Sequence, residues 1–148
     1  MYEFRVATHG DIMVVDGWGP WDRATVTAYA DAVVSAAQRM PFPWASLIRF
    51  RSEPLMWGET RDDIKQAVLR RVELGMRRLA VVMDEIPEAN LVRAQYAELY
   101  RECGIAYAFF GSDEHALAWL AEQGYGSAIA EIRAAAWRDA PPDSEPTR

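Results

Sequence analysis

Three residues in the last third of the chain carry side chains that can act together in nucleophilic catalysis. Cys103, Asp113 and His115 lie close together in the sequence. A cysteine activated by a histidine that a carboxylate orients is a recurrent catalytic arrangement. Cys103, however, falls on the buried stripe of its predicted helix, where a free cysteine commonly packs as a small hydrophobe. His115 falls in the exposed first turn of the next predicted helix. We therefore do not assign a catalytic role to this trio, since a motif needs its structural context.

The sequence contains no recognisable motif for a metal or nucleotide site. The histidines, His9 and His115, and the single cysteine are too widely spaced for a zinc pattern. The acidic pairs Asp62–Asp63 and Asp113–Glu114 both open predicted helices, where negative charge is favourable without any function. The strings "GWG" and "GYG" lack the spacing of a phosphate-binding loop, and no Gly-Lys-Ser/Thr occurs. We predict no metal, no cofactor and no enzymatic activity.

One connection in the chain is unusually apolar. The stretch "IRFRSEPLMWGETRDDI", Ile48 to Ile64, starts like a strand and ends like a capped helix, with Leu55, Met56 and Trp57 between the two. Three large apolar residues in a loop either fold back as a lid on the core or mark a contact surface. The loop joins a strand to a helix N-terminus, where binding residues collect on α/β sheets. We predict that Leu55, Met56 and Trp57 contact a ligand or partner, with the lid as the alternative.

The length, composition, net charge and cysteine count of the chain limit the class of protein. The 148 residues fit one domain, and the composition, 51% hydrophobic and 26% charged, is that of an ordinary globular protein. The net charge of −6 gives no basic surface for nucleic acid or anionic lipid. Cys103 alone excludes an internal disulfide and fits a reducing compartment. With no signal peptide and no apolar stretch of about 18 residues, we expect a soluble cytoplasmic protein without a membrane span.

The first half of the chain alternates between strand and helix signals. A His-Gly-Asp turn separates two β-rich runs, of which the second, Ile12 to Val15, is continuously apolar. Asp22 can cap the first helix, which the prolines of "MPFPW" end. The strand "ASLIRF" follows the prolines and leads into the apolar connection. Thr60 can cap the second helix, and the side chain of Asp63, at the third helical position, can accept a hydrogen bond from the backbone N–H of Thr60 in return.

The second half continues the alternation. The apolar strand "RRLAVVM" precedes a helix from Asn90 to Cys103, which Gly104 can terminate. The strand "IAYAFF" follows, and then a helix that Ser112 or Asp113 can cap. A last helix is predicted from Ala128 to Trp137, ahead of the Pro-rich tail "RDAPPDSEPTR".

This order predicts an α/β domain with a mixed sheet of about four to five strands. Strands joined by helices should be parallel, through right-handed crossovers, while the opening hairpin adds an antiparallel pair. We divide the chain into an α/β domain over residues 1–126, an extra C-terminal helix over 127–138 and a disordered tail over 139–148.

Two short strings, together with the order of elements, resemble a known family. "GPWD" (Gly19–Asp22) is similar to a turn into the first helix, and "YAFFGSDEHALAWL" (Tyr107–Leu120) is similar to a typical last strand and helix. The family is that of the STAS domains, the SpoIIAA-like anti-sigma-factor antagonists. Within it, the chain most resembles uncharacterised bacterial STAS/SEC14-like domain proteins. The resemblance covers roughly Phe4 to Glu122 and implies a SpoIIAA-like fold.

The resemblance also implies where a phosphoserine switch would lie. Phosphoregulated STAS domains carry an Asp-Ser pair at the helix start after the third strand. Here Ser52 comes too early, directly after the strand, and Thr60 is followed by Asp62 and Asp63. A phosphate on Thr60 would face two like charges. Because the Asp-Ser pair is absent, we do not expect either residue to serve as the phosphoacceptor of a switch.

Three functions remain, in order of preference. The first is a non-enzymatic binding or regulatory module that acts by protein contact without the phosphoserine switch. The second is a carrier of a small apolar ligand or lipid, because SEC14-like lipid-binding domains share this general fold. An enzyme of unknown class is third. We also predict a homodimer that uses the apolar stripe of the last helix, Ala128 to Trp137; the alternative is that this helix packs on its own sheet.

Overall fold

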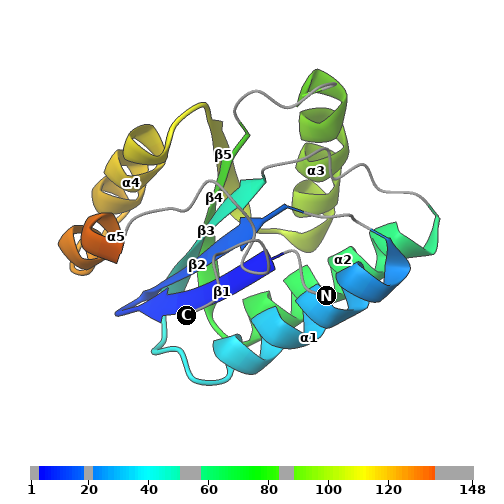
Figure 1. The fold of residues 1–148 in the computed structure, drawn as a ribbon, viewed down its shortest axis with the longest axis horizontal. Helices are drawn as coiled ribbons and strands as arrows, with labels where there is room; N and C mark the ends of the chain where they lie inside the picture. Colours follow the sequence, from blue (N-terminus) through cyan, green and yellow to red (C-terminus); the bar gives the residue numbers. More distant parts are fainter. Residues whose placement is uncertain (1–3, 19–21, 51–57, 84–88, 136–148) are drawn as a thin grey trace, which may run out of the picture.

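The computed structural model describes residues 4–18, 22–50, 58–83 and 89–135. Within these residues the chain forms one five-stranded mixed sheet with helices on both faces (Figure 1). Helices α1, α2 and α3 cover one face, and α4 and α5 cover the other. The predicted α/β class is therefore confirmed. In the described part of the chain, none of the helices is both long and apolar enough to cross a membrane.

The strands lie side by side in the order in which they occur along the chain. They are β1 (Phe4–His9), β2 (Ile12–Gly17), β3 (Trp44–Phe50), β4 (Met76–Val82) and β5 (Ala106–Phe110). The helices are α1 (Arg23–Ala37), α2 (Glu59–Glu73), α3 (Ala89–Cys103), α4 (Asp113–Glu122) and α5 (Ile129–Ala135). β1 and β2 form the predicted antiparallel hairpin, and the pairs β2–β3, β3–β4 and β4–β5 are parallel. Each parallel pair is joined through a helix, as parallel strands require.

Local capping explains three of the helix ends. The Asp22 carboxylate accepts a hydrogen bond from the Thr25 backbone N–H at 2.8 Å, which begins α1. Ser112, rather than Asp113, caps α4 by accepting from the backbone N–H of His115. Gly104 follows α3 at φ +71°, as predicted for a glycine that ends a helix.

The predicted cap of α2 is wrong. α2 begins after Gly58, whose φ is +49°, and this cap residue has no side chain that could accept a hydrogen bond from the first turn. Thr60 therefore lies inside that turn instead of preceding it. The left-handed backbone conformation of Gly58 directly precedes the first helical residue, Glu59. The helix therefore starts before Thr60, the residue that we predicted as its cap.

Within the described residues the C-terminal helix runs from Ile129 to Ala135, and its two isoleucines are covered. Ile129 and Ile132 of α5 are buried against the sheet and α4. These two residues pack on the chain's own sheet, which was the alternative, and so are not exposed for a dimer contact; the homodimer itself stays a prediction. Trp137 and the tail lie outside the described residues, and the domain division after residue 126 stays a prediction.

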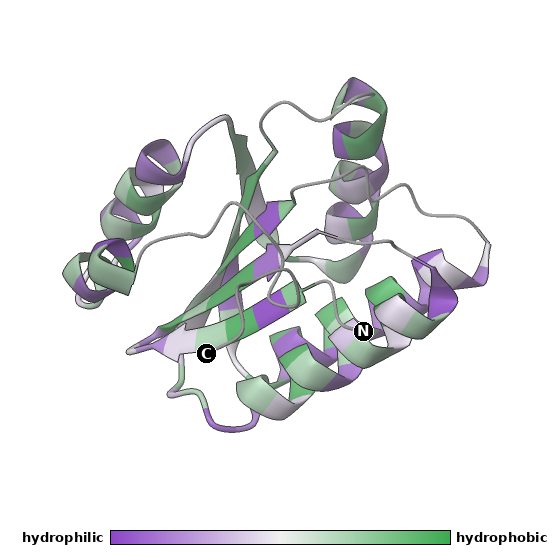
Figure 2. Cartoon of the chain, in the orientation of Figure 1, coloured by the Kyte–Doolittle hydropathy of each residue, from purple (hydrophilic) through white to green (hydrophobic). Residues whose placement is uncertain are grey.

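Each face of the sheet has its own apolar core, because side chains alternate between the faces along every strand. Ile48 of β3 packs under α1–α3, whereas its neighbour Leu47 packs under α4 and α5. With both faces covered, the central strands are largely apolar, and in Figure 2 the strands are mostly green with short purple segments. The larger core includes Phe50, Tyr96 and Tyr100, whose rings pack in sequence at centroid distances of 5.2 and 5.7 Å.

Candidate functional site

The ends of the four parallel strands define one edge of the sheet, which we call the carboxyl edge. Its strand ends are Gly17, Phe50, Val82 and Phe110. Helices α1 to α4 each follow one of these strands and so begin at the same edge (Figure 1). Ligands of open α/β sheets bind outside the carboxyl ends of the strands, so a binding site is expected at this edge.

The predicted contact residues Leu55, Met56 and Trp57 lie outside the described residues, as does Ser52. The residues that flank this segment are placed. Phe50 ends the middle strand β3, is 3% exposed and packs its ring against Tyr96. Gly58, on the other side, is exposed and begins α2. The segment is therefore attached at both of its ends to the carboxyl edge.

The start of α2 is acidic. Glu59 and Asp62 lie in its first turn, beside the half-buried Thr60. Arg23 at the start of α1 ion-pairs with Glu59, and its Nε lies 3.7 Å from an Asp63 oxygen. These pairs tie the N-termini of α1 and α2 together at the carboxyl edge. The acidic residues next to Thr60 in this first turn disfavour a phosphate there.

The trio of Cys103, Asp113 and His115 is not assembled. Cys103 is buried in the core beneath α1–α3, where its Sγ lies 3.9 Å from the Lys65 carbonyl oxygen. Burial raises the pKa of the Cys103 thiol, the opposite of what a thiolate nucleophile needs. Asp113 instead pairs with Arg49 on the other face of the sheet, and His115 is exposed on α4. Their proximity in sequence therefore does not produce a catalytic group.

His9 takes part in a contact between β1 and α5. Its Nδ1 lies 2.9 Å from Glu131 Oε1. His115 is on α4, so the two histidines come from different elements. Among the described residues, no group of three or more His, Cys, Asp or Glu side chains is placed to hold a metal ion.

The structure reveals a charged row that the sequence analysis missed. On the face covered by α4 and α5, Arg5 of β1, Asp16 of β2 and Arg49 of β3 are direct neighbours in register. Arg49 Nη1 then donates to Asp113 Oδ2 of α4 at 2.8 Å. Asp16 is 3% exposed, and the Arg49 and Asp113 side chains are 14% and 22% exposed. The row therefore alternates in sign across the sheet and is largely shielded from water.

A small pocket opens beside one end of the charged row. It lies between α5 and strands β1 and β2 and has a volume of about 90 Å³. Its lining consists of Arg5, Ala7, His9, Val14, Asp16, Ile132 and Ala135. Polar groups therefore lie at its ends, and apolar side chains form its floor and roof.

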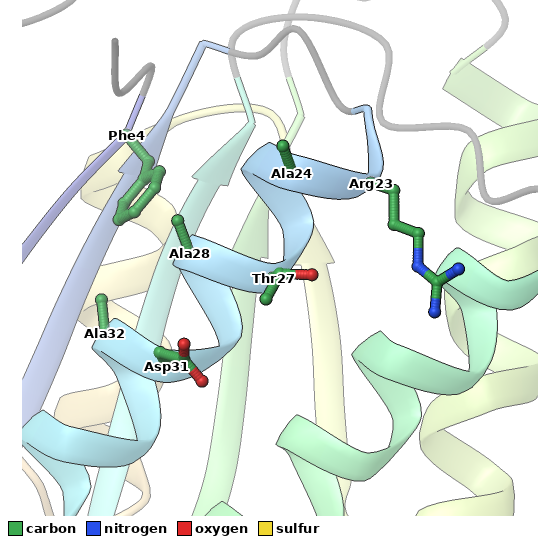
Figure 3. Close-up of a pocket in the computed structure, with 7 residues that line it drawn as sticks. All are labelled: Phe4, Arg23, Ala24, Thr27, Ala28, Asp31 and Ala32. Atoms are coloured by element: carbon green, nitrogen blue, oxygen red, sulfur yellow. The ribbon is translucent and has the colours of Figure 1, made fainter.

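A second, wider groove runs along the outer face of α1 (Figure 3). Its volume is about 900 Å³, and it is lined by Phe4, Arg23, Ala24, Thr27, Ala28, Asp31 and Ala32. Phe4 of β1 stands beside Ala28, while Arg23 extends toward α2. The groove is shallow because the side chains along α1 are small.

Comparison with family models, curated proteins and solved structures finds no match to the chain.

Proposed function

We propose that this protein is a non-enzymatic binding module that acts by protein–protein contact at its carboxyl edge, with Leu55, Met56 and Trp57 as the contact residues. The observation that carries the proposal is the attachment of their segment. It leaves the middle strand at the buried Phe50 and re-enters the fold at Gly58. We therefore expect the three consecutive apolar side chains to lie at the edge where α/β folds place their binding residues.

The packing of the core favours this proposal over a lipid carrier. A carrier needs a cavity, and sites for drug-sized ligands enclose about 300–1,000 Å³. In the described residues both faces of the sheet are filled, and the pocket between α5 and the sheet measures about 90 Å³. The larger groove lies on the outer surface of α1 and includes the charged residues Arg23 and Asp31.

The contact is proposed to be constitutive rather than switched by phosphorylation. Ser52 precedes the helix by several residues in the sequence, and Thr60 lies in an acidic first turn. The order of elements, a β-hairpin followed by alternating helices and strands, is consistent with the STAS resemblance. We propose that apolar residues take the place that the phosphoserine has in phosphoregulated STAS domains. We place the protein in the cytoplasm, as its single cysteine suggests.

The test compares two single alanine variants, one at Trp57 and one at Phe42. Trp57→Ala removes the largest proposed contact side chain. Phe42→Ala is the matched control, because Phe42 is an aromatic residue that is 70% exposed in the connection before β3, at the opposite edge of the sheet. A photo-crosslinking amino acid at position 55 would report partners in the native cell, and urea unfolding would report stability.

As a contact residue, Trp57 should be dispensable for folding. We expect Trp57→Ala to change the free energy of unfolding by less than about 1 kcal/mol and to abolish a discrete crosslinked partner that Phe42→Ala retains. If Trp57 instead closes the core as a lid, its loss should cost about 3 kcal/mol or more. That result, or crosslinking that does not depend on Trp57, would contradict the proposed function.

A further inference from the structure

The outer edge of β5 is open. β5 is the last strand of the sheet and pairs with β4 on one side, while no strand in the described part of the chain pairs with its other side (Figure 1). Ala106 is exposed and Tyr107 to Phe110 are half-buried, whereas all but one of the residues of the central strand β3 are buried. Solvent, and therefore a further strand, can reach this edge.

Two residues of β5 direct their backbone hydrogen-bonding groups outward. The Phe110 carbonyl oxygen accepts a hydrogen bond from the Met83 N–H at 3.1 Å, so the backbone groups of Phe110 point inward, toward the β4 side. The N–H and C=O of one residue point to the same side of a strand, and successive residues alternate. The backbone groups of Tyr107 and Phe109 therefore point away from β4, where none of the described strands meets them. Such an edge is a template for a further strand.

The side chains of β5 do not protect this edge. Natural sheets discourage pairing at an edge with charged side chains, prolines or bulges, and the sequence AYAFF has no charged residue and no proline. The Tyr107 and Phe109 rings lie 5.5 Å apart on the face of α3, and Tyr100 supports the Tyr107 ring at 5.4 Å. Arg101 of α3 donates to the Tyr107 hydroxyl oxygen at 3.1 Å. The two rings are thus fixed in place before a partner strand arrives.

Tyr107 and Phe109 lie symmetrically on the two sides of Ala108, which makes β5 complementary to a second copy of itself. In an antiparallel pair centred on Ala108, Tyr107 of each copy lies opposite Phe109 of the other, and each such pair exchanges both of its N–H···O bonds. The facing aromatic rings add cross-strand contact. Ala108 lies opposite its own copy in the closer, non-hydrogen-bonded pair, where a small side chain fits. We propose that β5 is a dimer surface at which two copies of this chain join their sheets into one.

The size and charge of β5 set the strength expected of this dimer. Five residues with their flanking side chains are fewer than the roughly 20–30 residues that each partner supplies to a standard interface. We therefore expect a reversible dimer with a Kd of about 10–100 µM. Because β5 carries no charge, pairing with its own copy brings no like charges opposite each other within the strand. This surface is separate from the α5 stripe and does not depend on the contact proposed at the carboxyl edge.

Sedimentation velocity on the full chain, from about 1 µM to about 1 mM, tests for the dimer. The weight-average mass should rise from that of a monomer toward that of a dimer over this range. Amide hydrogen exchange followed by NMR locates the surface, because the outward N–H groups of Tyr107 and Phe109 should exchange at least about threefold more slowly in the concentrated sample. The inward N–H of Phe110 is the internal control, and its exchange rate should change less.

Two cysteine variants test the register of the pair. Two copies of Ala108 would face each other with Cα atoms about 4.5 Å apart, within the range that a disulfide spans. Two copies of Ala106 would lie about 13 Å apart, because each is opposite Phe110 of the other copy, four residues away. Under mild oxidation Ala108→Cys should form a disulfide-linked dimer at least about tenfold faster than Ala106→Cys. Ala106 is the more exposed of the two, so random collision would favour the control. The buried Cys103 is common to both variants.

Three results would overturn the proposal. A chain that stays monomeric at about 1 mM would do so, and protection of its β5 amides by a different protein would then assign the edge to that partner. Crosslinking of Ala106→Cys as fast as Ala108→Cys would reject the register. Concentration-dependent protection that centres on β1 or α5 would place the dimer elsewhere. The wild-type measurements need no substitution, so they decide even if a cysteine variant fails to fold.

Discussion

Gly75, which joins α2 to β4, should be one of the least replaceable residues in the protein. Its φ is +113°, a conformation that residues with a Cβ atom rarely adopt. A Cβ at this position would lie 3.1 Å from both Cδ1 and Nε1 of Trp44 and 2.8 Å from Cδ2 of Phe42. The Gly75 carbonyl oxygen also accepts a hydrogen bond from the Trp44 backbone N–H at the start of β3. A methyl group here therefore disturbs both a side chain and the beginning of a strand.

The magnitude follows from which neighbour can move. Phe42 is 70% exposed and can turn away at little cost. Trp44 is fully buried, and its Nε1 donates to the Leu74 carbonyl oxygen at 2.9 Å, so its ring is held against the glycine. Backbone strain contributes about 1–2 kcal/mol, and overpacking against Trp44 adds about 1–3 kcal/mol. We expect Gly75→Ala to lower the free energy of unfolding by about 2–5 kcal/mol.

Gly104→Ala provides the matched control. Gly104 also has a positive φ, +71°, but a Cβ there would meet nothing within 4 Å. Only the strain remains, which for this left-handed conformation is about 1–2 kcal/mol. Urea unfolding followed by circular dichroism would measure both variants, with an unchanged m-value as the condition for comparing them. Equal destabilisation by the two substitutions would refute the reasoning, because it would leave no role for the contact with Trp44.

Three further predictions concern helix caps and the buried thiol. Ser112→Ala should destabilise the protein by about 1 kcal/mol, and more than Thr60→Ala, because Ser112 caps α4 whereas Thr60 does not cap α2; urea unfolding with the reverse order would contradict the assignment. The backbone N–H of Thr25 holds the pKa of Asp22 below its ordinary value of 3.8, so the stabilisation is present above pH 3.8 and is lost as the pH falls through the lowered pKa. The wild type should therefore lose stability relative to Asp22→Asn only below about pH 4, and a difference that changed near neutral pH would exclude this cause. Cys103 should react with a thiol reagent at least about tenfold more slowly in the native protein than in denaturant, because it is buried and its pKa is raised; similar rates would show that its site opens freely.

The sequence predicted those parts of the fold that depend on local patterns. Asp22 and Gly104 were identified as helix ends because capping by a carboxylate and termination by glycine need only neighbouring residues. Thr60 was misassigned because two nearby positions compete to start α2, and the backbone conformation of Gly58 decides between them. Local sequence patterns do not determine that conformation.

The candidate sites were harder to predict because they depend on pairing between distant segments. Nothing in the spacing of Arg5, Asp16 and Arg49 indicates that they are neighbours, since that follows from the register of three strands. The pocket beside them also requires α5 to fold back over the first hairpin. Sequence proximity, in contrast, suggested a link between Cys103 and Asp113 that the sheet separates onto opposite faces.

The agreement between strand order and chain order has a consequence for synthesis on the ribosome. As each strand emerges, it can join the strand made just before it, and α1 to α3 cover the first face as they appear. The second face is covered by α4 and α5, which are made last. Until then, Ile12, Leu47 and Val82 form an apolar surface without its covering helices. A nascent chain that stalls before α4 would therefore expose one complete side of its sheet, the kind of surface that chaperones shield and that promotes aggregation.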